Sequence, residues 1–180
     1  MFEIDEFIKD CRQALTENES RKAIREVLSR AVNDASSVAA ALEHQRAGLK
    51  VLHNSDELTV LNVVWGPHMQ LPAHDHRMWA AIGIYAGQED NAFYRRDGNT
   101  IVDSGGKQAR ERDVLFLGDD AIHSVTNPLG SYTGAIHVYG GDFIRQPRSQ
   151  WDPDTRLEEP WSMDTFQAIF EASNAAAEPL

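Results

Sequence analysis

Cysteine, positive charge and long hydrophobic runs are all scarce in this sequence of 180 residues. The single cysteine, Cys11, has no partner for an internal disulfide, so a disulfide framework is excluded. No run approaches the roughly 18 apolar residues of a membrane-spanning helix. The opening residues, MFEIDEFIKD, lack the basic segment and apolar core of a secretory signal. We therefore expect a cytoplasmic protein.

The shortage of positive charge bears on the partners. Lysine and arginine together number 17 against 28 acidic residues, which gives a formal net charge of -11. A field of that sign repels phosphate backbones and anionic membrane surfaces. Nucleic acid and membranes are therefore not expected partners, and an anionic substrate would need an arginine or lysine placed beside it.

The first part of the chain has the periodicity of helices. Apolar residues recur at helical spacing in two stretches, namely Phe7, Ile8, Cys11, Leu15 and then Ile24, Val27, Leu28, Ala31. A third, weaker helical stretch, SSVAAALEHQ, leads to Gly48, which we expect to end it. These apolar stripes are expected to pack against the rest of the chain.

Beyond the helices the sequence turns into short segments rich in β-branched and aromatic residues. These are LTVLNVVW, WAAIGIYAG, NAFYRR, TIVDSG, DVLFLG, HSVTN and TGAIHVYG, separated by the turn signals GP, DGN, SGGK, GDD, NPLG and GGD. Short strands at this spacing predict a sandwich or barrel rather than alternating strands and helices. Glycine-rich phosphate loops, a nucleophile elbow and CxxC pairs are absent.

Length and pattern together predict one mainly β domain, residues 1–180. Within it, residues 1–47 would form helices that pack on a barrel made by residues 48–146. Residues 147–180 would form a C-terminal extension with a short helix near MDTFQAIFEA and a frayed tail after it.

Two histidines one residue apart suggest chemistry. His74 and His76 lie in PAHDHRMWAAIG, and residues i and i+2 of a strand point to the same side, so both can reach one atom while Asp75 faces away. Imidazole is a common ligand of iron, zinc, copper and nickel. We expect the pair to lie at the start of a strand on the barrel rim and to form half of a metal site. The alternative is a solvated strand edge.

His123 is the third candidate ligand. It follows a strand and a glycine turn in DVLFLGDDAIHSVTN, and Asn127 comes four residues later. This pattern resembles the second signature of the cupin β-barrels, the double-stranded β-helix or jelly-roll proteins. Their first signature is H-x-H, then an acidic residue, then a glycine, but here residues 79–81, WAA, occupy the acidic position. The sequence thus predicts a metal site of His74, His76 and His123 with no carboxylate ligand and three open positions.

A three-histidine site of this kind, in a cupin-like chain with N-terminal helices, resembles the cysteine dioxygenase family of thiol dioxygenases. The segment AIHVYGG adds to the resemblance, because His137 and Tyr139 form an H-x-Y on one strand face. In that family the histidine hydrogen-bonds the tyrosine, whose hydroxyl points at substrate and oxygen, so the resemblance implies catalytic roles for both residues. The family's serine position is Ala135 here.

The resemblance also implies the cofactor and the reaction. It implies one Fe(II) per chain and oxidation of a small thiol carboxylate by O2 to its sulfinic acid, a step of the cysteine oxidation ladder. The mercaptopropionate type of the family takes its carboxylate-binding arginine from the segment after H-x-Y, where Arg148 lies, and its planar fork suits a carboxylate. The strand before H-x-H offers Lys50 and no arginine. The sequence therefore favours 3-mercaptopropionate or a similar mercapto-acid over cysteine.

Other readings stay open. A dicarboxylate such as mercaptosuccinate would need a second cation, for which Arg77 and Arg145 are candidates. A three-histidine cupin holding zinc, nickel or manganese could instead act as a hydrolase or isomerase through metal-activated water. Its acid or base would have to be Asp75, which is expected to face away, or Asp119 or Asp120 in a turn. A third alternative is a non-catalytic metal-binding cupin. Arg148 could also be structural, stacked on an aromatic ring or paired with a carboxylate.

Overall fold

The computed structural model describes residues 1–177. Three helices come first, α1 (Ile4–Ala14), α2 (Ser20–Asn33) and α3 (Ala35–Ala41). Their apolar stripes are buried, among them Phe7, Cys11 and Leu28. The prediction that Gly48 ends the third helix is wrong, because the chain is already extended at Leu42 and Gly48 is the first residue of a strand.

The strands within residues 1–177 form two antiparallel sheets. They are β1 (Gly48–Asn54), β2 (Thr59–Trp65), β3 (Gln70–Asp75), β4 (Ala80–Ala86), β5 (Gln88–Asp97), β6 (Thr100–Arg110), β7 (Val114–Leu117), β8 (Ile122–Thr126), β9 (Thr133–Tyr139), β10 (Ser149–Trp151) and β11 (Glu158–Pro160). The sheet orders are β1-β2-β9-β4-β7 and β11-β10-β3-β8-β5-β6.

The pairing is nested, with β2 beside β9, β3 beside β8, β4 beside β7 and β5 beside β6. One long hairpin wound up on itself produces this order, which is that of a jelly roll or double-stranded β-helix. The predicted fold, a mainly β cupin barrel with helices at the N-terminus, is therefore confirmed.

Strand β9 contributes to two hydrophobic cores, one between the two sheets and one between the five-stranded sheet and the N-terminal helices. Its seven residues are all buried, because the strand lies in a sheet that is covered on both faces. Ala135 and Tyr139 belong to the core between the two sheets, whereas Ile136 and Val138 belong to the core beneath the helices. The period-two alternation of a strand thus turns His137, which lies between Ala135 and Tyr139 in that alternation, toward the barrel interior.

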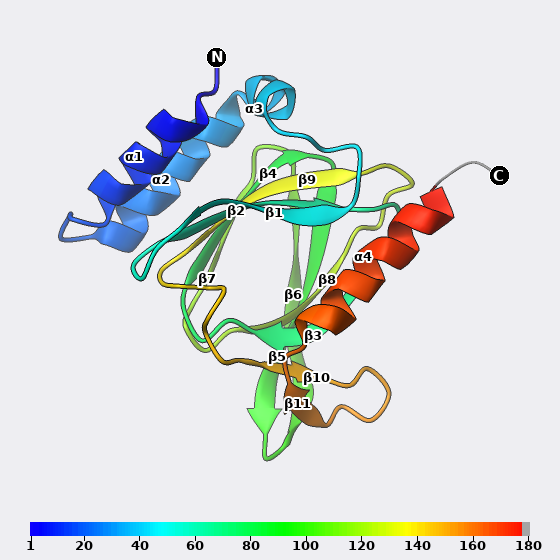
Figure 1. Cartoon of the computed structure of the whole chain (residues 1–180). Coiled ribbons are helices and arrows are strands. Elements are labelled where there is room, and N and C mark those ends of the chain that lie inside the picture. Colours follow the sequence, from blue (N-terminus) through cyan, green and yellow to red (C-terminus); the bar gives the residue numbers. More distant parts are fainter. Residues whose placement is uncertain (178–180) are drawn as a thin grey trace.

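Helices α1 and α2 lie against the outer face of the five-stranded sheet (Figure 1). The approach of α2 to β4 explains the glycine in AAIGIYA. A Cβ atom at Gly83 would come within 2.8 Å of side-chain carbons of Leu28 and Val32, so any larger residue would push the helix from the sheet. This layer closes the face of the barrel opposite to the C-terminal helix.

The C-terminal residues contribute to the barrel. Strand β10 pairs with β3, with Gln150 opposite His74, and α4 (Met163–Ala177) lies beside β1 and β3 at the mouth of the barrel (Figure 1). The helix is longer than predicted, and the frayed tail predicted after it reaches residues 178–180, which lie outside the described part. No helix within residues 1–177 is long and apolar enough to cross a membrane.

The SGGK segment does not form the predicted turn. It lies within β6, where Gly105 has a φ of +130° next to a bulge in the pairing with β5, between Phe93 and Tyr94. A glycine supplies the backbone conformation that such a bulge requires, so the strand continues through the segment.

Candidate metal centre

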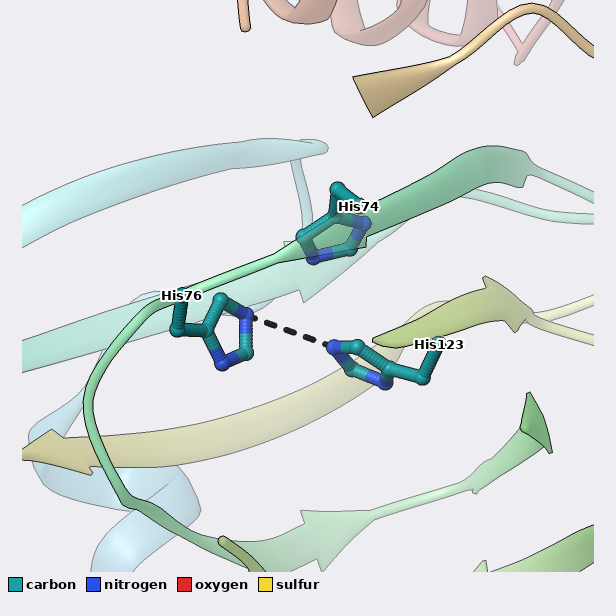
Figure 2. A group of neighbouring side chains, drawn as sticks. All are labelled: His74, His76 and His123. Carbon is teal, nitrogen blue, oxygen red and sulfur yellow. Dashed lines mark hydrogen bonds between the residues drawn. The ribbon is translucent and has the colours of Figure 1, made fainter. Parts of the chain in front are cut away.

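Two neighbouring strands bring the three predicted ligands together. His74 on β3 is directly opposite His123 on β8, and His76 lies one residue beyond the end of β3. One ligand nitrogen from each of the three histidines can be chosen so that all lie within 4.8 Å of one another (Figure 2). This group could hold a metal ion.

The histidine pair ends a strand instead of starting one, which corrects the prediction. Strand β3 begins at Gln70 and runs through Pro72 to Asp75. Proline lacks a donor for the ladder, and the register with β8 shifts between Leu71 and His74, so the strand tolerates Pro72 at an irregularity. The alternation still holds across it, since Asp75 faces away and pairs with Arg77 and Arg96 at 3.3 and 3.5 Å.

Hydrogen bonds fix the orientation of two of the imidazoles. Nδ1 of His74 lies 3.0 Å from the carbonyl oxygen of Pro72, and Nδ1 of His123 lies 2.7 Å from Oδ1 of Asn91. Both oxygens only accept, so each Nδ1 carries the proton and each Nε2 keeps its lone pair. Nε2 of His123 lies 3.3 Å from Nε2 of His76 (Figure 2). The donor set therefore fits a metal of the iron or zinc type.

All three imidazoles are held neutral. Burial lowers the pKa of His74 from 6.5 to about 4, with a smaller effect from Arg148. Burial, and after it the neighbouring imidazoles, also lower the pKa values of His76 and His123 well below the ordinary range. Neutral imidazole is the form that ligates metals, so the ligands are ready at neutral pH.

Acid is expected to destabilise the metal-free protein. Unfolded histidines titrate near 6.5, whereas His74 binds its proton only at about 4 and burial lowers the pKa of His137 in the same direction. Below pH 6.5 the unfolded state then binds more protons, so stability is lost as the pH falls. Burial raises the pKa of Glu89, which opposes the trend, but it is one group against four histidines.

The measurement is the urea midpoint of the protein in a chelator, followed by tryptophan fluorescence between about pH 7 and pH 5. A midpoint that falls with pH is expected, with the same dependence in the variant His68→Asn, because His68 is exposed. A midpoint that does not change with pH would contradict the buried, neutral state of the cluster.

A cavity of about 560 Å³ opens from the histidines toward α4. Its wall is mostly apolar, with Val63, Leu71, Val125, Phe143, Phe166 and Phe170 among the lining residues. Among the described lining residues one is acidic, Glu171 on α4. Such a cavity offers room for a small organic molecule beside the histidines.

The H-x-Y pair lines the same cavity. Nδ1 of His137 lies 2.9 Å from the hydroxyl of Tyr139, and the phenol ring meets the ring of His76 edge-on, with centroids 5.1 Å apart. Two residues before His137 stands Ala135, which has no hydroxyl to offer. The structure thus places Tyr139 beside a candidate ligand and His137 behind it.

Arg148 is buried beside the site, with 5% of its surface exposed. Its guanidinium lies between the rings of Phe143 and Trp161, 3.8 and 3.7 Å from their centroids, and both rings line the cavity. Nη1 donates to the carbonyl of Phe143. Nε and Nη2 have no hydrogen-bond partner among residues 1–177. Burial lowers the pKa of Arg148 to about 10, so it stays charged at neutral pH.

A buried cation with two unpartnered N–H groups is costly, and Nε and Nη2 form the edge of the fork that could pair with an anion. Arg148 itself is not among the residues that line the cavity, whereas the two rings around it are. The backbone around Arg148 is held by Asp75, whose Oδ1 accepts from the amide of Ser149 at 2.7 Å. Asp75, the neighbour of His74 on β3, thereby connects the ligand strand to the start of β10, directly after Arg148.

The other sequence candidates lie elsewhere. Arg77 pairs with Asp75 and donates to Ser149 Oγ, and the side chain of Arg145 is 82% exposed. Neither lines the cavity, whereas Arg46, which the sequence did not single out, does. Asp119 pairs with Arg21 at 2.7 Å, and neither Asp119 nor Asp120 lines the cavity. The predicted second cation and the predicted acid or base are thus not at the histidines.

Sequence reasoning also missed Glu89, which is fully buried. It accepts from Nε1 of Trp65 at 2.8 Å and from Nδ2 of Asn91 at 3.0 Å. Its Oε2 lies 3.8 Å from Nε2 of His137. Strand β5 starts at Gln88, earlier than predicted, so Glu89 and Asn91 share one face at i and i+2. That alternation is the signal that could have identified them.

No protein-family model matches the sequence. Several solved structures match the barrel. An RmlC-like cupin family protein with a double-stranded β-helix fold, from Methanocaldococcus jannaschii, is 12% identical, with a TM-score of 0.46 over 56% of this chain and 85% of its own. A cupin superfamily protein from Desulfitobacterium hafniense is 14% identical, with a TM-score of 0.47 over 58% of this chain and 88% of its own.

A variant of oxalate decarboxylase from Bacillus subtilis is also 14% identical, with a TM-score of 0.45 over 65% of this chain and 29% of its own. At these identities the similarity concerns the barrel and not its chemistry.

Proposed function

We propose that this cupin-fold protein is a non-haem Fe(II) thiol dioxygenase that converts a small thiol carboxylate to its sulfinic acid. One observation carries the proposal. Three neutral histidines without a carboxylate ligand line an apolar cavity together with the rings of Phe143 and Trp161. These two rings enclose the buried Arg148, which has two N–H groups without a partner among residues 1–177. The cluster suits a soft, anionic sulfur ligand, and the arginine suits a carboxylate.

The metal would be held by His74, His76 and His123, one ion per chain. Bound there, Fe(II) would favour the thiolate form of the substrate and bring it together with O2. The overall balance is one thiolate and one O2 giving one sulfinate, RSO2⁻. Sulfur loses four electrons and both oxygen atoms accept them, so no external reductant is required.

The residues of the chain would orient the substrate. Arg148 would bind the carboxylate through Nε and Nη2, and the rings of Phe143 and Trp161 fix the plane of that fork. Tyr139, hydrogen-bonded to His137, would donate to the polar atoms of the reacting group. The apolar wall keeps water away from the sulfur. Holding sulfur and carboxylate at a fixed separation selects substrates by chain length.

The cavity also bears on the choice among thiols. Cysteine would bring an ammonium group toward three histidines and the Arg148 cation. A carboxylate that could pair with this ammonium is lacking beside the histidines, because the one acidic residue among the described lining residues is Glu171, on α4. A mercaptoalkanoate carries no such charge. These features support 3-mercaptopropionate or a bulkier mercapto-acid over cysteine.

Oxygen uptake tests the proposal. The protein is loaded anaerobically with Fe(II) and mixed with 3-mercaptopropionate, mercaptosuccinate or cysteine in parallel, and O2 consumption and sulfinate are measured. Consumption with equimolar sulfinate, fastest for a mercaptoalkanoate, is the expected result. No uptake with any thiol, at one iron per chain, would reject the reaction and turn attention to metal-activated water.

A further inference from the structure

Glu89 lies outside the three-histidine cluster, but it is joined to it through hydrogen bonds. Its side chain is fully buried, and each oxygen accepts from one donor, Oε1 from Asn91 and Oε2 from Trp65. A buried carboxylate is expensive unless its oxygens are satisfied. Its presence in the barrel therefore calls for a role that an apolar side chain could not fill.

The direction of these hydrogen bonds matters. Because Oε1 of Glu89 accepts, the amide of Asn91 must turn its nitrogen toward Glu89 and its oxygen toward His123. That oxygen accepts the Nδ1 proton of His123 at 2.7 Å, which leaves Nε2 unprotonated. A proton on Oε2 of Glu89 would not change this, since Oε1 would still accept.

The opposite orientation of Asn91 would have the opposite effect. Its NH2 group would then face Nδ1 of His123, and the imidazole would have to carry its proton on Nε2 to pair with it. Nε2 is the atom that faces His76 across 3.3 Å. A protonated Nε2 has no lone pair for a metal, so the amide orientation decides whether His123 can ligate.

Glu89 also faces the second histidine of the network. Its Oε2 lies 3.8 Å from Nε2 of His137, whose Nδ1 pairs with the hydroxyl of Tyr139. At 3.8 Å these two atoms are not hydrogen-bonded, and Nε2 of His137 has no hydrogen-bond partner among residues 1–177.

We propose that Glu89 is a positioning residue that sets the tautomer of His123 through Asn91 and thereby controls metal affinity from outside the ligand set. This inference rests on the metal-binding part of the proposed function and not on the thiol reaction. Groups that orient metal-bound histidines typically contribute roughly 10- to 100-fold in affinity.

The variant Glu89→Gln tests it. Glutamine has one acceptor oxygen for two donors, so either Trp65 or Asn91 loses its partner, and the amide of Asn91 is free to turn. In the metal-free protein, 15N NMR of the imidazoles is expected to show His123 shifting toward the Nε2-protonated tautomer. Co(II) affinity is expected to fall roughly 10- to 100-fold. Asp90→Asn, the same charge change at the next residue of β5, should alter neither.

The double variant Glu89→Gln with Asn91→Asp exchanges the carboxylate and the amide. The carboxylate introduced by Asn91→Asp would accept both from His123 and from the amide introduced by Glu89→Gln. The oxygen of that amide would still accept from Trp65. Wild-type tautomer and Co(II) affinity are expected to return. This variant keeps the side-chain sizes and the charge, so it decides the matter even where the single variant does not fold.

Two results would overturn the proposal. One is an unchanged His123 tautomer and Co(II) affinity in Glu89→Gln, and the other is a double variant without rescue of both. Neither readout involves a thiol. Failure of the dioxygenase assignment would appear as absent sulfinate with normal Co(II) binding, and the two failures are therefore distinguishable.

Discussion

Replacement of His123 by alanine is expected to abolish iron retention and, with it, sulfinate formation. The side chain supplies one of three ligand nitrogens, held by Asn91 at 2.7 Å and facing His76 at 3.3 Å. With no carboxylate in the set, two imidazoles would remain. Loss of an orienting group alone costs roughly 10- to 100-fold in metal affinity, so loss of a ligand should exceed that. Iron per chain after desalting is the measurement.

The matched control removes a histidine outside the cluster. His68 is exposed and has a φ of 56°, a conformation that asparagine tolerates well. His68→Asn should keep one iron per chain. If His123→Ala retained iron to the same level as this control, the three histidines would not form the metal centre.

Replacement of Arg148 by glutamine is expected to raise KM strongly while iron stays bound. The guanidinium offers Nε and Nη2 to a carboxylate at one edge and is not among the candidate ligands. Hydrogen bonds to charged groups contribute about 1.5–3 kcal/mol each, so losing the pair should lower kcat/KM roughly 100-fold or more. Steady-state kinetics with 3-mercaptopropionate, together with iron analysis, provides the test.

Two further variants separate charge from geometry. Arg145→Gln removes the same charge three residues away, from a side chain that is 82% exposed, and should leave kinetics unchanged. Arg148→Lys keeps the charge but loses the planar fork, and should recover only part of kcat/KM. An Arg148→Gln variant that oxidised every thiol acid as well as the Arg145 control would remove the basis for carboxylate recognition.

The parts of the site that the sequence predicted are those governed by local geometry. His74 and His76 lie two residues apart, and strand alternation alone turns them to one side. The same alternation turns Asp75 outward and brings His137 next to Tyr139. The pair lies at the end of β3 and not at the start of a strand, but the two side chains still point to one side because the alternation does not depend on where the strand begins.

The parts that the sequence did not predict depend on contacts between distant elements. The rings that flank the guanidinium of Arg148 come from Phe143, five residues before it, and from Trp161, which lies beyond β10 and β11. Glu89 lay outside the predicted strands, because the strand NAFYRR was expected to start at Asn91. The role of α4 as a wall of the cavity likewise follows from where the barrel mouth lies, which periodicity does not reveal.

The fate of the oxygen atoms distinguishes a dioxygenase from chemistry with metal-activated water. The Fe(II)-loaded protein is supplied with 3-mercaptopropionate under 18O2 in ordinary water, and the mass of the product is measured by mass spectrometry. The expected product is a sulfinate that carries two 18O atoms. A product without 18O, or with oxygen drawn from water, would contradict a dioxygenase reaction at His74, His76 and His123.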